Sequence, residues 1–154
     1  MNTFHKLNAT VLGAGYSPFA PGTMGALVGV GILYGIHFFQ PELEYFTWGL
    51  LIASIVFTLL GVWSTNELEV EWGKDPSKVV VDELVGVWIG LLWIPVDWFW
   101  LLLGFALFRF FDIAKPLFIR QLEKIKGGWG VMLDDVLAGI YTNIVLQVLV
   151  IYWK

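Results

Sequence analysis

The sequence predicts an all-α fold, a compact polytopic bundle of about five apolar helices in a membrane, formed by a single domain over residues 1–154. Two observations on composition support this class. Hydrophobic residues make up 58% of the chain and charged residues only 14%, whereas a soluble domain has about 25% charged residues. Most of the nine tryptophans lie near the ends of apolar runs, as in the aromatic belts found at membrane interfaces.

Five apolar stretches account for the predicted helices. In chain order they are residues 24–39, 46–63, 79–95, 98–113 and 130–153. Most are shorter than the ~20 residues that cross a ~30 Å hydrocarbon core. We therefore expect their polar ends to lie at the interface, or some stretches to be only partly inserted. The third is the weakest candidate for a span, because two adjacent carboxylates interrupt it.

The segment before the first stretch, "GAGYSPFAPGTMG" (residues 13–25), is rich in proline and glycine. This composition predicts an irregular segment that leads into the helix, with Thr23 as a candidate N-cap. Backbone N–H groups at such a helix start could bind an anion such as a substrate phosphate. A tight turn capped by Thr23 would explain the same pattern. Within the stretch, the spacing of Gly25–Gly29 and Gly31–Gly35 favours close helix packing.

The connecting segments differ sharply in basic residues. Seven Lys or Arg residues lie in residues 1–23, 64–78 and 114–130, and none lies in residues 40–45 or 96–97. The positive-inside rule therefore predicts a cytoplasmic N-terminus. No secretory signal peptide is recognisable at the N-terminus.

This orientation brings acidic residues of three helices to the cytoplasmic end of the bundle. They are Asp82, Glu83, Asp112, Asp134 and Asp135. Taken singly, each has a simpler explanation, since acidic residues favour helix N-termini and Arg109 could pair with Asp112. Two acidic doublets at one depth are harder to explain in this way. Carboxylates crowded together repel one another unless a cation neutralises them.

The residue types narrow the chemistry of this cluster. Hard oxygen ligands suit Mg²⁺, which commonly binds one or two carboxylates together with substrate phosphates. Arg109 and Lys115 could offset phosphate charge, with Pro116 placing Lys115 at a helix end. The chain has no cysteine, no basic stripe for nucleic acid and no nucleotide-binding or serine-hydrolase motif. Metal-assisted chemistry on a phosphate fits what remains.

Four motifs occur in an order and spacing similar to those of the phosphatidylglycerophosphatase A family. They are "GYSPFAPGTMG", "VVVDELVG", "FRFFDIAKP" and "GGWGVMLDDVLAG". The resemblance implies a bacterial inner-membrane enzyme with an all-helical fold and a site facing the cytoplasm. Its expected reaction is Mg²⁺-dependent hydrolysis of phosphatidylglycerophosphate to phosphatidylglycerol and phosphate.

Carried onto this sequence, the resemblance implies three groups of site residues. The catalytic group is Asp82, Glu83, Asp112, Asp134 and Asp135. The metal ligands are Asp82, Glu83, Asp112 and Asp135, and the phosphate contacts are Arg109, Lys115 and Thr23. The expected partners are the phospholipid substrate and membrane lipids, with no nucleic acid and no oligomeric state specified. The alternatives are a metal-dependent lipid phosphotransferase and a non-catalytic membrane protein that binds or transports cations.

Overall fold

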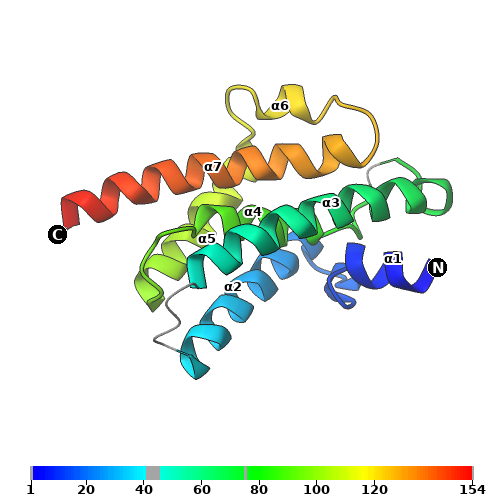
Figure 1. Ribbon diagram of the computed structural model, residues 1–154. Coiled ribbons are helices and arrows are strands. Elements are labelled where there is room, and N and C mark those ends of the chain that lie inside the picture. The colour runs from blue at the N-terminus through cyan, green and yellow to red at the C-terminus, as the bar shows by residue number, and fades with distance from the viewer. Residues whose placement is uncertain (1, 41–45, 75, 154) are drawn as a thin grey trace.

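The computed structural model describes residues 2–40, 46–74 and 76–153. These residues form only helices, which confirms the predicted all-α class. In chain order the elements are α1 (Asn2–Ala9), the 3₁₀ helix η1 (Ala14–Tyr16), α2 (Pro21–Phe39), α3 (Phe46–Trp72), α4 (Val81–Gly90), α5 (Trp98–Ala114), α6 (Ile119–Leu122) and α7 (Gly128–Trp153). Figure 1 shows α3 and α7 lying side by side along the bundle.

Each of the five predicted stretches contains one of the longer helices, but the five are not equivalent. Within residues 2–40, 46–74 and 76–153, three helices are long and apolar enough to cross a membrane: α2, α3 and α7. Helix α4 has ten residues, a rise of about 15 Å, which is half the thickness of a hydrocarbon core. The expectation of about five membrane helices is therefore met in part, with three candidate spans among the described residues.

Helix α4 lies at the centre of the bundle and packs against α2, α3, α5 and α7. Eight of its ten residues are buried. Close approach to α2 depends on the first predicted glycine pair, because a Cβ on Gly29 would lie 2.7 Å from Val87 Cγ1. The indole N–H of Trp88 donates a hydrogen bond to the Gly29 carbonyl at 3.0 Å. The second pair, Gly31 and Gly35, has no such role, since an added Cβ would meet no described atom within 4 Å.

The start of α2 differs from the expectation of an irregular segment through residue 25. The helix begins at Pro21, with Ala20 as its N-cap in the left-handed region (φ 44°). Proline suits the first helical position, because the N–H that it lacks would have no partner there. Thr23 is therefore inside the first turn, and the prediction that it caps the helix is wrong.

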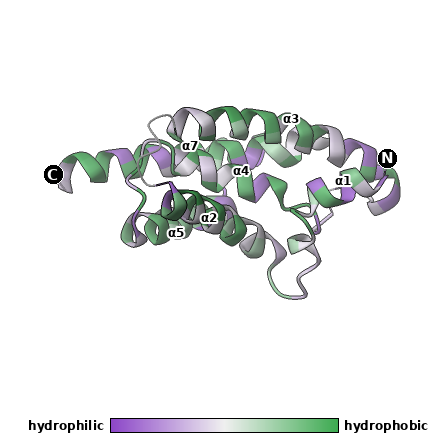
Figure 2. Ribbon diagram, turned by 60° about the horizontal axis from the view of Figure 1, so that its bottom comes forward, coloured by the Kyte–Doolittle hydropathy of each residue, from purple (hydrophilic) through white to green (hydrophobic). Residues whose placement is uncertain are grey.

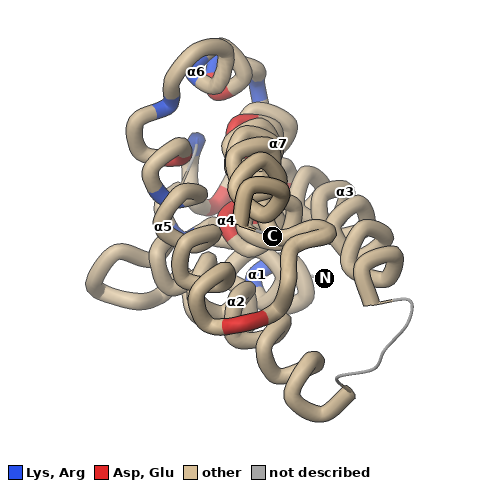
Figure 3. Tube along the Cα trace, turned by 90° about the vertical axis from the view of Figure 1, so that its left-hand side faces the viewer, with Lys and Arg blue, Asp and Glu red and all other residues tan. Residues whose placement is uncertain are grey.

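The polar residues gather at one end of the bundle. Hydrophobic residues cover most of α2, α3 and α5, and hydrophilic residues are concentrated near α1 (Figure 2). Viewed along the bundle, the acidic segments of α4 and α7 lie between the helices, while basic segments lie on α5 and around α6 (Figure 3). Helix α5 ends at Ala114, and Lys115 adopts the left-handed region as its C-cap, which confirms the helix end predicted from Pro116.

Candidate active site

A cavity of about 560 Å³ opens where the N-terminal ends of α2, α4 and α7 meet the C-terminal parts of α3 and α5. All but one of the expected site residues line it. These are Asp82, Glu83, Arg109, Asp112, Lys115, Asp134 and Asp135. They come from α4, α7, and α5 with its C-cap, and Asp82 and Asp135 are 53 residues apart in the chain. The predicted convergence of the acidic residues is therefore confirmed. The exception is Thr23, which is not among the lining residues.

Three carboxylates converge closely enough to share one cation. One oxygen from each of Asp82, Glu83 and Asp135 lies within 4.8 Å of the others. Each side chain also has a buried oxygen without a hydrogen-bond partner among the described residues: Asp82 Oδ1, Glu83 Oε2 and Asp135 Oδ2. Buried polar atoms rarely lack a partner unless a water, an ion or a ligand supplies one. This donor set fits a hard divalent cation such as Mg²⁺.

The electrostatics of α4 lead to the same conclusion. Burial, and then the negative charges of Glu83 and Asp135, raise the pKa of Asp82 well above its usual range. A carboxyl group in this position loses its proton at a higher pH than an exposed aspartate does, because the charged form is both desolvated and repelled. A divalent cation would offset both costs, so metal binding and deprotonation of Asp82 are expected to be coupled.

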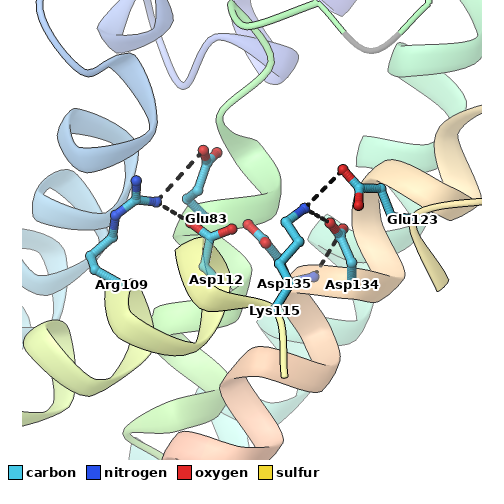
Figure 4. A network of polar contacts seen from close by, with 7 residues as sticks. All are labelled: Glu83, Arg109, Asp112, Lys115, Glu123, Asp134 and Asp135. Atoms are coloured by element: carbon cyan, nitrogen blue, oxygen red, sulfur yellow. Dashed lines mark hydrogen bonds and ion pairs between the residues drawn. The ribbon is translucent and has the colours of Figure 1, made fainter. Parts of the chain in front are cut away.

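Arg109 links α4 to α5 beside these carboxylates. Its Nη1 forms an ion pair with Asp112, three residues further along α5, and lies 3.9 Å from Glu83 Oε1. Figure 4 shows both carboxylates on one side of the guanidinium, each joined to it by a dashed line. Asp112 is not one of the three carboxylates that converge, but it lies close enough to Asp135 for their negative charges to repel each other. The Nε of Arg109 is buried and has no described partner.

Lys115 forms the second basic contact of the cavity. Its Nζ lies 2.6 Å from Asp134 Oδ2 and 3.3 Å from Glu123 Oε1, so it joins α7 to the segment after α6 (Figure 4). Burial opposes the charge on the ammonium group, but the hydrogen bond and charge of Asp134 and the charge of Glu123 outweigh it. Together they raise the pKa of Lys115 above its usual value. Asp134 also accepts a hydrogen bond from the Asp135 N–H at 3.0 Å.

The start of α2 forms another wall of the cavity, and it belongs to the segment, residues 13–25, that the sequence suggested as an anion-binding helix start. The cavity is lined there by Ala20, Pro21 and Gly22. A Cβ added at Gly22 would lie 2.0 Å from Glu83 Oε1 and 3.2 Å from Arg109 Nη1. Only a residue without a side chain fits here while Glu83 keeps its position.

Several other polar lining residues were not predicted. They are Thr65, Glu69, Lys74, Ser77 and Glu123. Thr65 and Glu69 lie in α3 beyond the apolar stretch that ends at residue 63. Polar residues are common at the end of any apolar helix, so their polarity alone does not indicate a site. Their spacing of four places both on one helical face, which is the one signal in the sequence that could have grouped them.

A model of the family described as phosphatidylglycerophosphatase A matches residues 7–150. The chain is 41% identical to "Phosphatidylglycerophosphatase A" of Haemophilus influenzae, over 99% of this chain and 91% of that protein. It is 34% identical to the protein of the same name in Escherichia coli K12, over 99% and 86% of the two chains.

A further relative carries a different name. The chain is 50% identical to a protein of Bacteroides thetaiotaomicron named "Putative phosphatidylinositol-3-phosphatase", over 92% of this chain and 91% of that protein. No solved structure matches the chain. The names of all three relatives describe phosphatases that act on a phospholipid headgroup.

Proposed function

We propose, because this chain belongs to the phosphatidylglycerophosphatase A family, that it hydrolyses the terminal phosphate of phosphatidylglycerophosphate and releases phosphatidylglycerol. Family membership makes the chain an enzyme, a phosphatase. Family membership therefore favours neither of the two alternatives, a lipid phosphotransferase and a non-catalytic membrane protein that binds or transports cations. The observation that carries the proposal is the convergence of Asp82, Glu83 and Asp135 in a polar cavity at one end of an apolar bundle.

The proposed cofactor is Mg²⁺, held by Asp82, Glu83 and Asp135. When bound, the ion would neutralise the carboxylates and polarise a phosphoryl oxygen of the substrate. Support comes from the spacing of the three oxygens and from their lack of other partners. This assignment leaves Asp112 out of the ligand set and gives it the task of holding Arg109.

The chain's own residues account for the rest of the reaction. Arg109 lies on one side of Glu83, Asp112 and Asp135, and Lys115 lies on the other (Figure 4). Their positive charges stabilise the phosphate as charge develops in the transition state. A carboxylate of the cavity orients the attacking water. Hydrolysis breaks the bond between phosphorus and the headgroup oxygen, and water supplies the hydroxyl of the phosphate and the proton of the released alcohol.

The proposed location is the cytoplasmic face of a bacterial inner membrane. The Lys and Arg residues of the connecting segments lie at the same end of the bundle as the cavity, and such residues favour the cytoplasmic side. Three helices are long and apolar enough to hold the chain in the bilayer. The acyl chains of the substrate would stay among these helices while the headgroup reaches the cavity.

A second candidate substrate is phosphatidylinositol 3-phosphate, because a relative with 50% identity carries that name. Both lipids present a phosphate monoester on a headgroup joined to diacylglycerol by a phosphodiester. The metal and the two basic residues would treat the monoester in the same way, so headgroup selection must depend on the rest of the cavity wall.

The experiment measures phosphate release from each lipid by the purified protein in detergent, with Mg²⁺ and with EDTA. We expect turnover of phosphatidylglycerophosphate with Mg²⁺ only, and a loss of at least ~100-fold in Asp135→Asn. Asp97→Asn is the matched control: Asp97 is also an aspartate but caps α5 away from the cavity, and asparagine caps equally well. Hydrolysis of the inositol lipid alone would favour the second candidate, and hydrolysis of neither lipid would overturn the proposal.

A further inference from the structure

Thr65, on the α3 side of the cavity, has a hydroxyl group that the fold itself does not use. The residue is 3% exposed, it lines the cavity, and its Oγ1 has no hydrogen-bond partner among the described residues. A buried hydroxyl without a partner costs free energy of folding. Its presence therefore calls for an explanation outside the folded chain.

Other hydroxyls in the long helices show what Thr65 could have done. Ser54, Thr58 and Thr142 each donate a hydrogen bond to the carbonyl four residues earlier, at 2.8, 2.7 and 2.9 Å. This is the usual way for a buried helical hydroxyl to find a partner. Thr65 has the Gly61 carbonyl in the same relation and does not bond to it.

The position of Thr65 on α3 directs it towards the carboxylates. Gly61 lies one turn earlier on the same face, and a Cβ added there would lie 2.5 Å from Met132 Sδ and 3.1 Å from Val81 Cγ1. This face of α3 therefore lies against the junction of α4 and α7. Val81 directly precedes Asp82 in the chain, so Thr65 lies on the face of α3 that packs against the helices carrying the metal-binding carboxylates.

Unpartnered buried atoms are concentrated around this one cavity. Among the described residues, every such side-chain atom except His5 Nε2 belongs to a cavity residue: Thr65 Oγ1, Asp82 Oδ1, Glu83 Oε2, Arg109 Nε and Asp135 Oδ2. The three carboxylate oxygens need a cation. The hydroxyl and the guanidinium N–H can both donate, and the oxygens of a phosphate would accept from them.

We propose that the Thr65 hydroxyl donates a hydrogen bond to an oxygen of the substrate's terminal phosphate, opposite the metal-binding carboxylates. This inference rests on the proposed function for the identity of the substrate. It adds a binding residue from α3, a helix in which the sequence had suggested none. Thr65 would hold both the substrate phosphate and the phosphate product.

Three variants separate this role from a structural one. Thr65→Val keeps the shape and removes the donor, and Thr65→Ser keeps the donor. Thr142→Val is the matched control, because Thr142 is equally buried in a long helix but already donates to a carbonyl and does not line the cavity. Each variant is assayed for kcat and KM with phosphatidylglycerophosphate, for calorimetric binding of inorganic phosphate with Mg²⁺, and for its thermal unfolding midpoint.

We expect Thr65→Val to lower kcat/KM by ~10- to 100-fold, as the loss of one hydrogen bond to a charged group does. Phosphate binding should weaken in Thr65→Val. The thermal unfolding midpoint should stay the same or rise, because the substitution removes no hydrogen bond within the folded chain. Thr65→Ser should restore turnover and phosphate binding. Thr142→Val should show the opposite pattern, with full turnover and an unchanged or lower midpoint.

If the wild-type protein hydrolyses the lipid and Thr65→Val has the same kcat/KM and the same affinity for phosphate, this inference is overturned and the proposed function stands. If the wild type hydrolyses neither lipid, the proposed function fails, and phosphate binding alone then decides the role of Thr65. Equal affinity for phosphate in the wild type and Thr65→Val would overturn the inference in that case too.

Discussion

Replacing Gly22 by alanine should damage the site while leaving the fold intact. The added methyl group would lie 2.0 Å from Glu83 Oε1, where ordinary contacts begin near 3.4 Å. The carboxylate must therefore move by more than about 1 Å. Because it is the end of a flexible side chain, it can swing aside at little cost to folding. In doing so it leaves its place beside Asp82 and Asp135.

The structure gives the expected size of the effect. A misplacement of about 1 Å at a reacting centre costs about 100-fold in rate, which is about 2.7 kcal/mol of transition-state stabilisation. The apparent affinity for Mg²⁺ should also fall in Gly22→Ala, because one of three proposed ligands has moved. The free energy of unfolding should stay within about 1 kcal/mol of the wild type, since alanine also reduces the entropy of the unfolded chain.

The assay measures kcat/KM across a Mg²⁺ titration, together with unfolding in detergent. Gly31→Ala is the matched control, because Gly31 is in the same helix and an added Cβ meets no described atom within 4 Å. It should keep wild-type kinetics and gain about 0.5–1 kcal/mol of stability. Wild-type turnover and Mg²⁺ dependence in Gly22→Ala would refute the assignment of Glu83 to the metal.

Three further predictions concern stability. Gly139→Ala places a Cβ 2.4 Å from the Gly86 carbonyl oxygen, where backbone cannot swing aside, so the unfolding free energy should fall by about 1–3 kcal/mol; a wild-type denaturation curve would contradict this packing. Asp97→Ala removes the side chain that accepts from two N–H groups at the start of α5 and should cost about 1 kcal/mol in the same measurement. Because the pKa of Lys115 is raised in the folded state, the stability due to its pairing with Asp134 is fully present below pH 10.5 and is lost as the pH rises through the higher folded pKa. The difference in unfolding midpoint between the wild type and Lys115→Met should therefore be constant from pH 7 to 9 and shrink above the unfolded pKa of Lys115. A difference that grew with pH would contradict this direction of the pH dependence.

Much of the site could be predicted because a membrane simplifies the arrangement of helices. Apolar stretches that alternate in direction bring every second end to the same side, which predicts that Asp82, Asp112 and Asp135 lie at one end of the bundle. The cavity confirms this. What could not be predicted is which oxygens converge, since that depends on rotation about each helix axis and on side-chain rotamers.

The errors have local physical causes. Hydrophobicity counted α4 among about five apolar helices, with its stretch as the weakest candidate for a span, and the structure gives it ten residues, most of them buried by neighbouring protein. A short apolar run has the same composition in either environment. The capping role of Thr23 was inferred from residue type, but Pro21 already starts the helix. Thr65 carries no distinctive pattern, and only the missing hydrogen bond in three dimensions identifies it.

The enclosure of α4 has a consequence for how this sequence can vary. Helices α3 and α7 have only 22% of their most apolar windows buried inside the protein, so many of their positions need only be apolar. Helix α4 has neighbours on every side, and its buried residues include an acid for the site, glycines for close approach and a tryptophan for a hydrogen bond. Each residue of α4 is therefore constrained by the particular group that it contacts. In a saturation library selected for lipid phosphatase activity, tolerated substitutions should therefore be fewest along α4 and most frequent on the outward faces of α3 and α7.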